Sequence, residues 1–211
     1  QGVSSAASDV YKRQGIDHQS LKEVNPKIIT CSISGFGDTE VNRPAYDNLI
    51  QGYAGAMSIT GTDKENPVKS GIPIADLGAG LYAVIGILSA IQSREKNDSG
   101  EHVDISMLDT QVSLLTYMAT MHFLSGENPE PIGNQHMNHV PFNSYRTSDG
   151  FIQIGVVAED FWPSLIEALD LKQLDTEENK LRSGRLKNRE NIDQVVPVSY
   201  THLTLPTILL V

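Results

Sequence analysis

The sequence has little cysteine and lacks the marks of several large protein classes. One cysteine, Cys31, occurs in 211 residues, so no disulfide can form within the chain, which fits a reducing compartment. No metal-ligand spacing, phosphate-loop motif, internal repeat or low-complexity tract is present. These absences argue against disulfide scaffolds, zinc modules and repeat proteins.

Basic residues are also in deficit. The chain has 16 Lys and Arg against 26 Asp and Glu, which gives a formal net charge of -10. An acidic chain argues against nucleic acid as a partner. Any polyanionic ligand would therefore need a few cations placed locally. The length suffices for one sizeable core or for part of a larger one.

The two ends of the chain are expected to be foreign to the protein. Residues 4–14 are the translation of a transposase-type sequencing adapter, and residues 198–207 are one frame of its reverse complement. Such a pair is not expected by chance. We therefore expect residues 1–14 and 197–211 to be adapter-derived and the rest to be an internal fragment of a longer gene. The apolar tail is also too short to span a membrane, and no membrane partner is expected.

Apolar periodicity predicts alternating strands and helices in the first part of the chain. Ile28–Ile33 is β-branched and nearly all apolar, as in a buried strand, and apolar spacing predicts a helix over Ala79–Arg94. The other elements expected here are helices at Gln19–Val24 and Tyr46–Tyr53, an extended segment at Ile72–Ala75, a strand at His102–Ile105, and a helix from Met107 to about Leu124 that Ser106 caps. This order predicts an α/β layer.

The pattern changes after Gly126, where we place a domain boundary. A segment with two prolines and a glycine is followed by Phe142–Arg146 and Phe151–Val156, which predict a hairpin with a tight turn at Ser148–Gly150. Helices are expected at Glu159–Leu169 and from Asn188 onward. The expected domains therefore cover residues 15–126 and 127–196.

Asp76 is the most informative residue of the sequence. It lies in Gly71–Gly80, after an apolar run and before the helix predicted from Ala79. A carboxylate at a strand-to-helix turn is near the positive end of the helix dipole, and the small Gly78 and Gly80 would let a bulky ligand approach. Two interpretations remain open at this point: a helix N-cap, or a nucleophilic carboxylate.

A set of short motifs around Asp76 carries a family resemblance. The motifs are Ser32–Gly37, Ala45–Asp47, Gln51–Gly55, Ile59–Gly61, Gly71–Gly80, Ser93–Glu95, Gly100–Ser106, Gly133–His136, Pro141–Phe142 and Thr147–Gly150. In this order they resemble the family III CoA-transferases, the group of formyl-CoA and carnitine CoA-transferases and of α-methylacyl-CoA racemase. The resemblance covers roughly Gly15 to Val196, and it makes Asp76 the counterpart of the family's catalytic residue.

The resemblance implies an enzyme and its substrates. The parent would move CoA from an acyl-CoA to a small carboxylic acid, with coenzyme A as co-substrate, no permanently bound cofactor and no metal. Residues 15–126 would form the back half of a nucleotide-type α/β domain, and residues 127–196 the start of a smaller α+β domain, in an interlocked homodimer. The location would be cytoplasmic, or the mitochondrial or peroxisomal matrix of a eukaryote. The fragment alone would be inactive.

The same resemblance implies a covalent mechanism. The carboxylate of Asp76 would form an anhydride with the donor acyl group and then an aspartyl-CoA thioester. The tetrahedral oxyanions need hydrogen-bond donors, and the backbone amides of Leu77–Gly80 are candidates.

Tyr46 and Asp47 form a second candidate constellation. In the racemase branch a His-Asp pair occupies this place and supplies an acid/base, whereas the phenol of Tyr46 is a poor base at neutral pH. The residue pair therefore favours transfer over racemisation. The alternatives are an α-methylacyl-CoA racemase or isomerase, a non-catalytic acyl-CoA-binding relative, and, for the pair itself, a packed Tyr beside a helix-start Asp.

Two further residues are candidates for substrate contact. His136 matches a His found in family members; it would line the acyl pocket or only hydrogen-bond to backbone. Arg43 would meet a CoA phosphate or remain a solvated loop cation.

Overall fold

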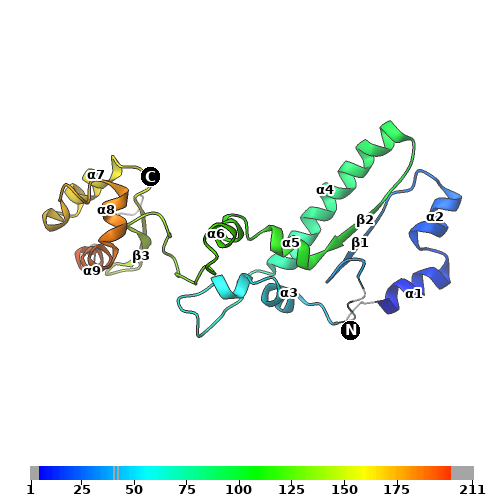
Figure 1. Ribbon diagram of the computed structural model, residues 1–211, viewed down its shortest axis with the longest axis horizontal. Coiled ribbons are helices and arrows are strands. Elements are labelled where there is room, and N and C mark those ends of the chain that lie inside the picture. Colours follow the sequence, from blue (N-terminus) through cyan, green and yellow to red (C-terminus); the bar gives the residue numbers. More distant parts are fainter. Residues whose placement is uncertain (1–4, 40, 42, 201–211) are drawn as a thin grey trace. The chain divides into compact units, whose positions relative to one another are not determined.

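The computed structural model describes residues 5–39, 41 and 43–200, and the chain divides into two compact units after Pro131 (Figure 1). The expected adapter-derived segments fall partly outside the described residues, while residues 5–14 form a helix. The boundary proposed near Gly126 lies a few residues before this division. Each unit is described by itself below.

The first unit is built on two parallel strands, β1 (Thr30–Ser34) and β2 (His102–Ser106). The long helix α4 (Ile74–Asn97) lies between them in sequence and packs against both (Figure 1). The other elements are α1 (Ser5–Gln14), α2 (His18–Val24), α3 (Asp47–Tyr53), a 3-10 turn η1 (Ala56–Ile59), α5 (Met107–Ser113) and α6 (Tyr117–Ser125). This unit is the mixed α/β arrangement that the alternating pattern predicted.

Helix α4 buries its small residues and exposes its large ones. Its buried positions are Ala75, Gly78, Ala79, Ala83 and Ala90. Its exposed aliphatic residues are Leu77, Leu81, Val84, Ile85 and Leu88. The small residues allow close packing, since a Cβ on Gly86 would lie 2.5 Å from Val103 Cγ1 of β2. Length and composition alone would let α4 cross a membrane, but a core helix passes the same test.

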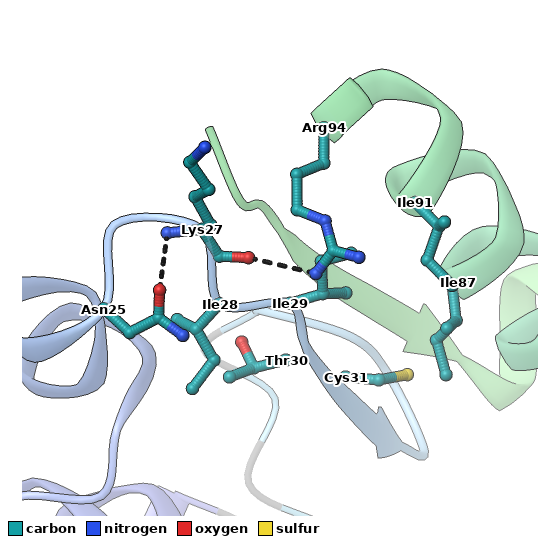
Figure 2. Close-up of a pocket in the computed structure, with 9 residues that line it drawn as sticks. All are labelled: Asn25, Lys27, Ile28, Ile29, Thr30, Cys31, Ile87, Ile91 and Arg94. Carbon is teal, nitrogen blue, oxygen red and sulfur yellow. Dashed lines mark hydrogen bonds between the residues drawn. The ribbon is translucent and has the colours of Figure 1, made fainter. Parts of the chain in front are cut away.

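Strand β1 is less buried than the sequence predicted. Cys31 and Ile33 are exposed, so the expectation of a buried strand is wrong for β1. Among the described strands β1 pairs with β2 alone, and a hollow of about 330 Å³ next to Cys31 lies between the segment leading into β1 and the second half of α4 (Figure 2). Desolvation, and then the charge of Asp104, raises the pKa of the Cys31 thiol, which disfavours the thiolate.

The helix predicted from Met107 to Leu124 is two helices. Its start is confirmed, because the Ser106 hydroxyl accepts the backbone amide of Asp109 at 3.1 Å. Its continuity is wrong, because Thr116, between α5 and α6, has a φ of 50°. A β-branched residue seldom adopts a positive φ, so the two apolar segments do not form one rod.

The second unit carries the predicted hairpin. Strands β3 (Phe142–Arg146) and β4 (Phe151–Gly155) pair antiparallel, and the Thr147 hydroxyl donates to Asp149 in the turn. The helices are α7 (Phe161–Ala168), α8 (Arg182–Lys187) and α9 (Arg189–Tyr200), with a 3-10 turn η2 (Lys172–Leu174). The fully or almost fully buried apolar side chains include Val140, Trp162, Leu171, Leu174, Ile192 and Val196.

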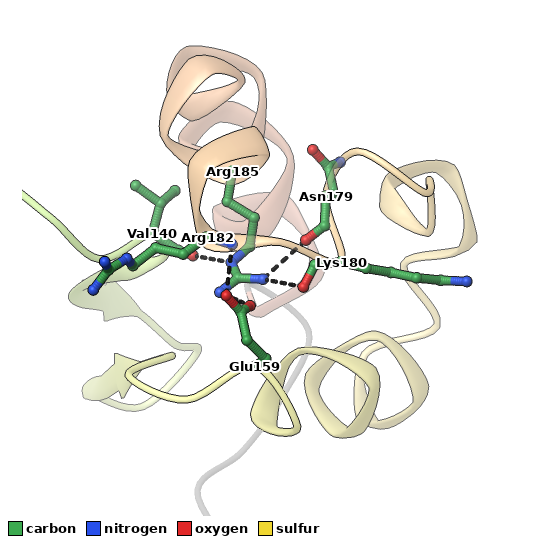
Figure 3. A network of polar contacts seen from close by, with 6 residues as sticks. All are labelled: Val140, Glu159, Asn179, Lys180, Arg182 and Arg185. Atoms are coloured by element: carbon green, nitrogen blue, oxygen red, sulfur yellow. Dashed lines mark hydrogen bonds and ion pairs between the residues drawn. The ribbon is translucent and has the colours of Figure 1, made fainter.

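A buried cation ties this second unit together. The guanidinium of Arg185 is 1% exposed and lies 5.3 Å from the centre of the Trp162 ring. It donates to three backbone carbonyls and pairs with one carboxylate at 2.9–3.0 Å; these belong to Val140, Asn179, Lys180 and Glu159 (Figure 3). The planar guanidinium group therefore connects α8 to the residues just before the hairpin and just before α7.

Candidate active site

Asp76 lies in the first turn of α4 and is exposed to solvent. The predicted extended segment Ile72–Ala75 is wrong in its second half, because the helix already begins at Ile74. Asp76 is therefore inside the helix and is not its N-cap; the cap position is Pro73, which offers no side-chain bond. The carboxylate is near the positive end of the helix dipole, where a negative charge is stabilised.

The cap of α4 comes from another helix. The Asp47 carboxylate, at the start of α3, accepts the backbone amides of Ala75 at 2.9 Å and Asp76 at 3.4 Å through its Oδ1 atom. Ile50 of α3 packs with Ala75 and Ala79 in one buried cluster, which holds the two helices together. The structure thus joins two of the candidate residues, Asp47 and Asp76, by direct contact.

The other oxygen of Asp47 is also occupied. Gln51 Nε2 donates to Asp47 Oδ2 at 2.6 Å, and Gln51 Oε1 accepts the backbone amide of Ser70 at 2.8 Å. Gln51 is 1% exposed. The sequence interpretation placed Gln51 in a motif but gave neither Gln51 nor Ser70 a role, although the spacing of Asp47 and Gln51, four residues apart on one helix, is typical of an interacting pair.

The backbone amides of Leu77–Gly80 are not available as oxyanion donors. The Leu77 amide donates to the Pro73 carbonyl at 3.0 Å, and the following amides lie within the regular α4 helix. The two glycines differ in surroundings. A Cβ on Gly78 would lie 3.1 Å from side-chain atoms of Thr110 in α5 and of Leu114, the residue after α5. A Cβ on Gly80 would meet no atom within 4 Å. Gly78 thus serves helix packing, and Gly80 leaves open space.

Tyr46 and Arg43 lie in the segment before α3, and both residues are exposed to solvent. Tyr46 is 51% exposed, and its backbone carbonyl accepts the amide of Ile50 at 3.0 Å. Arg43 is exposed and lies between residue 42, which is outside the described residues, and Pro44. The structure therefore places Tyr46 next to Asp47 in the chain, with its side chain accessible to a ligand.

His136 belongs to the second unit and has a defined orientation there. Its Nδ1 accepts the backbone amide of Asn138 at 3.0 Å, so a neutral ring carries its proton on Nε2. Its carbonyl accepts from the Arg189 guanidinium at 2.7 Å, and its ring lies 4.6 Å from the ring of His139. Sequence reasoning missed Arg189, which has no local pattern.

The hollow beside β1 is not part of the Asp76 site. Ile87 is the lining residue of α4 nearest to Asp76, and it lies about 16 Å further along the helix axis at 1.5 Å per residue. Among the described residues, no group of three or more His, Cys, Asp or Glu side chains is arranged to hold a metal ion.

Comparisons with known proteins identify the family of the chain. The family model for CoA-transferase family III matches residues 3–202. The succinate–glutarate CoA-transferase of Agrobacterium fabrum is 32% identical over 92% of this chain and 49% of its own length. The succinyl-CoA:mesaconate CoA-transferase of Haloarcula marismortui is 34% identical over 83% of this chain and 46% of its own length.

Solved structures lead to the same family. A CAIB/BAIF family protein from Brucella suis matches with a TM-score of 0.81 and 33% identity, over 93% of this chain and 53% of that one. The chain spans about half the length of the curated relatives it matches. Since the family model covers most of the chain, the chain belongs to the family III CoA-transferases.

Proposed function

We propose that the whole protein transfers coenzyme A from an acyl-CoA to a small carboxylic acid, with Asp76 as the nucleophile. The observation that carries this proposal is an exposed carboxylate in the first turn of α4, whose backbone amide is held by Asp47. A carboxylate can act as a nucleophile and form a covalent acyl intermediate.

The proposed cycle exchanges one acyl group for another. The Asp76 carboxylate attacks the thioester, the carbon–sulfur bond breaks, and a mixed anhydride and CoA thiolate form. The thiolate then attacks the aspartyl carbonyl and releases the donor acid as a carboxylate. The acceptor carboxylate displaces CoA from the aspartyl thioester, and the thiolate takes the acceptor acyl group from the second anhydride. Asp76 is regenerated, and the cycle trades one thioester for another without ATP.

Three other candidate residues of the first unit have a part in this proposal. Tyr46 contacts the substrate with its exposed phenol, and Arg43 pairs with a CoA phosphate. Gly80 leaves room for the bound acyl chain. Because the amides after Asp76 are used within α4, the oxyanion donors come from segments other than α4.

The names of the relatives suggest the substrate class. One is named for succinate and glutarate and another for succinyl-CoA and mesaconate; succinate, glutarate and mesaconate are dicarboxylates, and succinyl-CoA is the CoA thioester of one. We therefore assign a dicarboxylic acid as acceptor. The test uses purified full-length protein with succinyl-CoA and either glutarate, mesaconate or butyrate. New acyl-CoA with the dicarboxylates, and little with butyrate, is expected; hydrolysis alone would contradict transfer.

The racemase alternative is tested in the same preparation. Tyr46 has no basic imidazole, so deuterium from solvent should not enter the α-carbon of a 2-methylacyl-CoA. Tyr46→His should not create efficient exchange either, because an imidazole also needs an orienting partner and an α-carbon within reach. Rapid exchange by the unmodified protein would favour racemisation.

The assembly of the whole protein is also part of the proposal. The exposed aliphatic face of α4 supports an interlocked homodimer in which other chain segments cover this face. Light scattering of the full-length protein should give the mass of two chains, and a stable monomer would contradict this assembly.

A further inference from the structure

Gln51 has a side chain whose two ends have different partners. It is 1% exposed, its Nε2 donates to Asp47 Oδ2, and its Oε1 accepts the amide of Ser70. A reversed amide would place Oε1 against a carboxylate and its NH₂ group against another N–H donor. The partners therefore fix the orientation of Gln51.

The hydrogen bonds continue through Asp47 to Asp76. Ser70 in the loop before α4 donates to Gln51, Gln51 donates to Asp47, and the amides of Ala75 and Asp76 donate to Asp47. Each donor in this series meets an oxygen acceptor on Asp47 or Gln51. Three segments of the chain are thus held in one arrangement by one carboxyl group and one amide.

We propose that Gln51 is a positioning residue of the transfer reaction, acting through Asp47 on the backbone of Asp76. The inference rests on the proposed role of Asp76 as nucleophile. A misplacement of about 1 Å at a reacting group can cost about a hundredfold in rate. Gln51 is buried away from solvent, so its loss should lower kcat and leave the KM for acyl-CoA nearly unchanged.

A substitution that keeps the shape of Gln51 separates this role from simple core filling. In Gln51→Glu, a protonated carboxyl can donate to Asp47 and accept from Ser70, as the amide does. When it ionises, two carboxylates meet at hydrogen-bond distance, which raises the pKa of the introduced group. The variant should therefore be active at acid pH and lose activity as the pH rises through that raised value.

The first experiment measures kcat and KM against pH in the full-length protein. Gln51→Glu should lose about a hundredfold in kcat on the alkaline side. Gln51→Met should be low at every pH, because both bonds are absent. The matched control is Gln92→Glu, an exposed site on α4 that gains the same charge, and it should follow the wild type. A Gln51→Glu profile parallel to that of the wild type would overturn the proposal.

A double variant tests directly whether the order of donors and acceptors in this series matters. In Asp47→Asn with Gln51→Glu, the ionised carboxyl accepts from the new amide and from Ser70, while the amide oxygen accepts from Ala75 and Asp76. All donors again have acceptors, so alkaline activity should recover about tenfold over Gln51→Glu alone. No recovery would show that these residues do not act as one series.

A second readout does not need activity. Hydrogen–deuterium exchange of the peptide covering residues 72–79, compared with wild type at each pH, should be faster in Gln51→Glu only at alkaline pH. If exchange becomes faster only at alkaline pH while Asp76→Ala keeps full activity, the hydrogen-bond series is supported and the assignment of Asp76 as nucleophile is contradicted. If the exchange shows no pH switch, the inference fails whatever the activity.

Discussion

The carboxylate of Asp47 accepts the backbone amide of Asp76 at 3.4 Å, so an acid on α3 fixes the backbone of an acid on α4. The bond with Ala75 is shorter, at 2.9 Å, and the two together satisfy amides that a helix start leaves without an internal partner. The candidate nucleophile is therefore free to use its own side chain for chemistry.

Replacing Asp76 tests its proposed chemical role. Asp76→Ala in the full-length protein should lower turnover by several powers of ten while CoA binding survives, because the variant loses only the covalent step. Steady-state assays and calorimetric titration with CoA measure the two effects. Asp109→Ala, which removes the acid from the first turn of α5, is the matched control and should stay active. A variant that retains about a tenth of wild-type activity would contradict the assignment.

Replacing Asp47 tests the cap. Asp47→Ala should lower the free energy of unfolding by about 0.5–2 kcal/mol, because the amides of Ala75 and Asp76 lose their acceptor. Urea denaturation followed by circular dichroism measures the change. Asp160→Ala is the control, since Asp160 occupies the N-cap position of α7 without a side-chain cap bond, and it should change stability by less than about 0.5 kcal/mol. Equal effects would show that Asp47 is not a cap.

Arg185 should be the most sensitive polar position of the second unit. Arg185→Met leaves buried carbonyls without this donor and removes one partner of the exposed Glu159, which should cost at least about 1–3 kcal/mol. Trp162 is the chain's one tryptophan, so its fluorescence during denaturation reports on this unit. Arg146→Met, at an exposed position, is the control. An equal loss of unfolding free energy in this variant would show that Arg185 has no particular role in stability.

Acid should destabilise the second unit through His139. Burial first, and then the positive charges of His136, Arg182 and Arg185, lower the pKa of His139 below its ordinary value. The unfolded chain takes up a proton at about pH 6.5 that the folded chain takes up only at lower pH, so stability falls as the pH drops through this range.

The measurement for His139 compares Trp162 denaturation midpoints at about pH 7.5 and about pH 5.5. His139→Gln should be less sensitive to this change of pH than the wild type, because the titrating group is gone. An unchanged sensitivity would assign the effect to other groups.

Local patterns predicted most of the elements but not the contacts between them. The spacing of Leu81, Val84, Ile85 and Leu88 located α4, yet these residues are exposed and the alanines are buried. Periodicity marks an apolar face without saying what covers it. The start of α4 was missed for a related reason, because its cap lies 29 residues earlier in the chain than Asp76.

The candidate site was predictable only where a motif carried it. Asp76, Tyr46 and His136 stand in recognisable segments, so the resemblance located them. Gln51 also stands in a motif, but the motif does not indicate its bond to the Ser70 amide, 19 residues later. Arg185 likewise bonds to the carbonyl of Val140, 45 residues earlier. No residue pattern within one element announces such bonds, and only the folded chain reveals them.

Trapping of the covalent intermediate tests the central claim most directly. Full-length protein is incubated with succinyl-CoA and hydroxylamine, digested, and analysed by mass spectrometry. The proposed anhydride or thioester predicts a hydroxamate on the peptide that contains Asp76, formed only when acyl-CoA is present and absent in Asp76→Ala. A fully active protein that yields no hydroxamate, or yields it on another residue such as Asp47, would contradict the account.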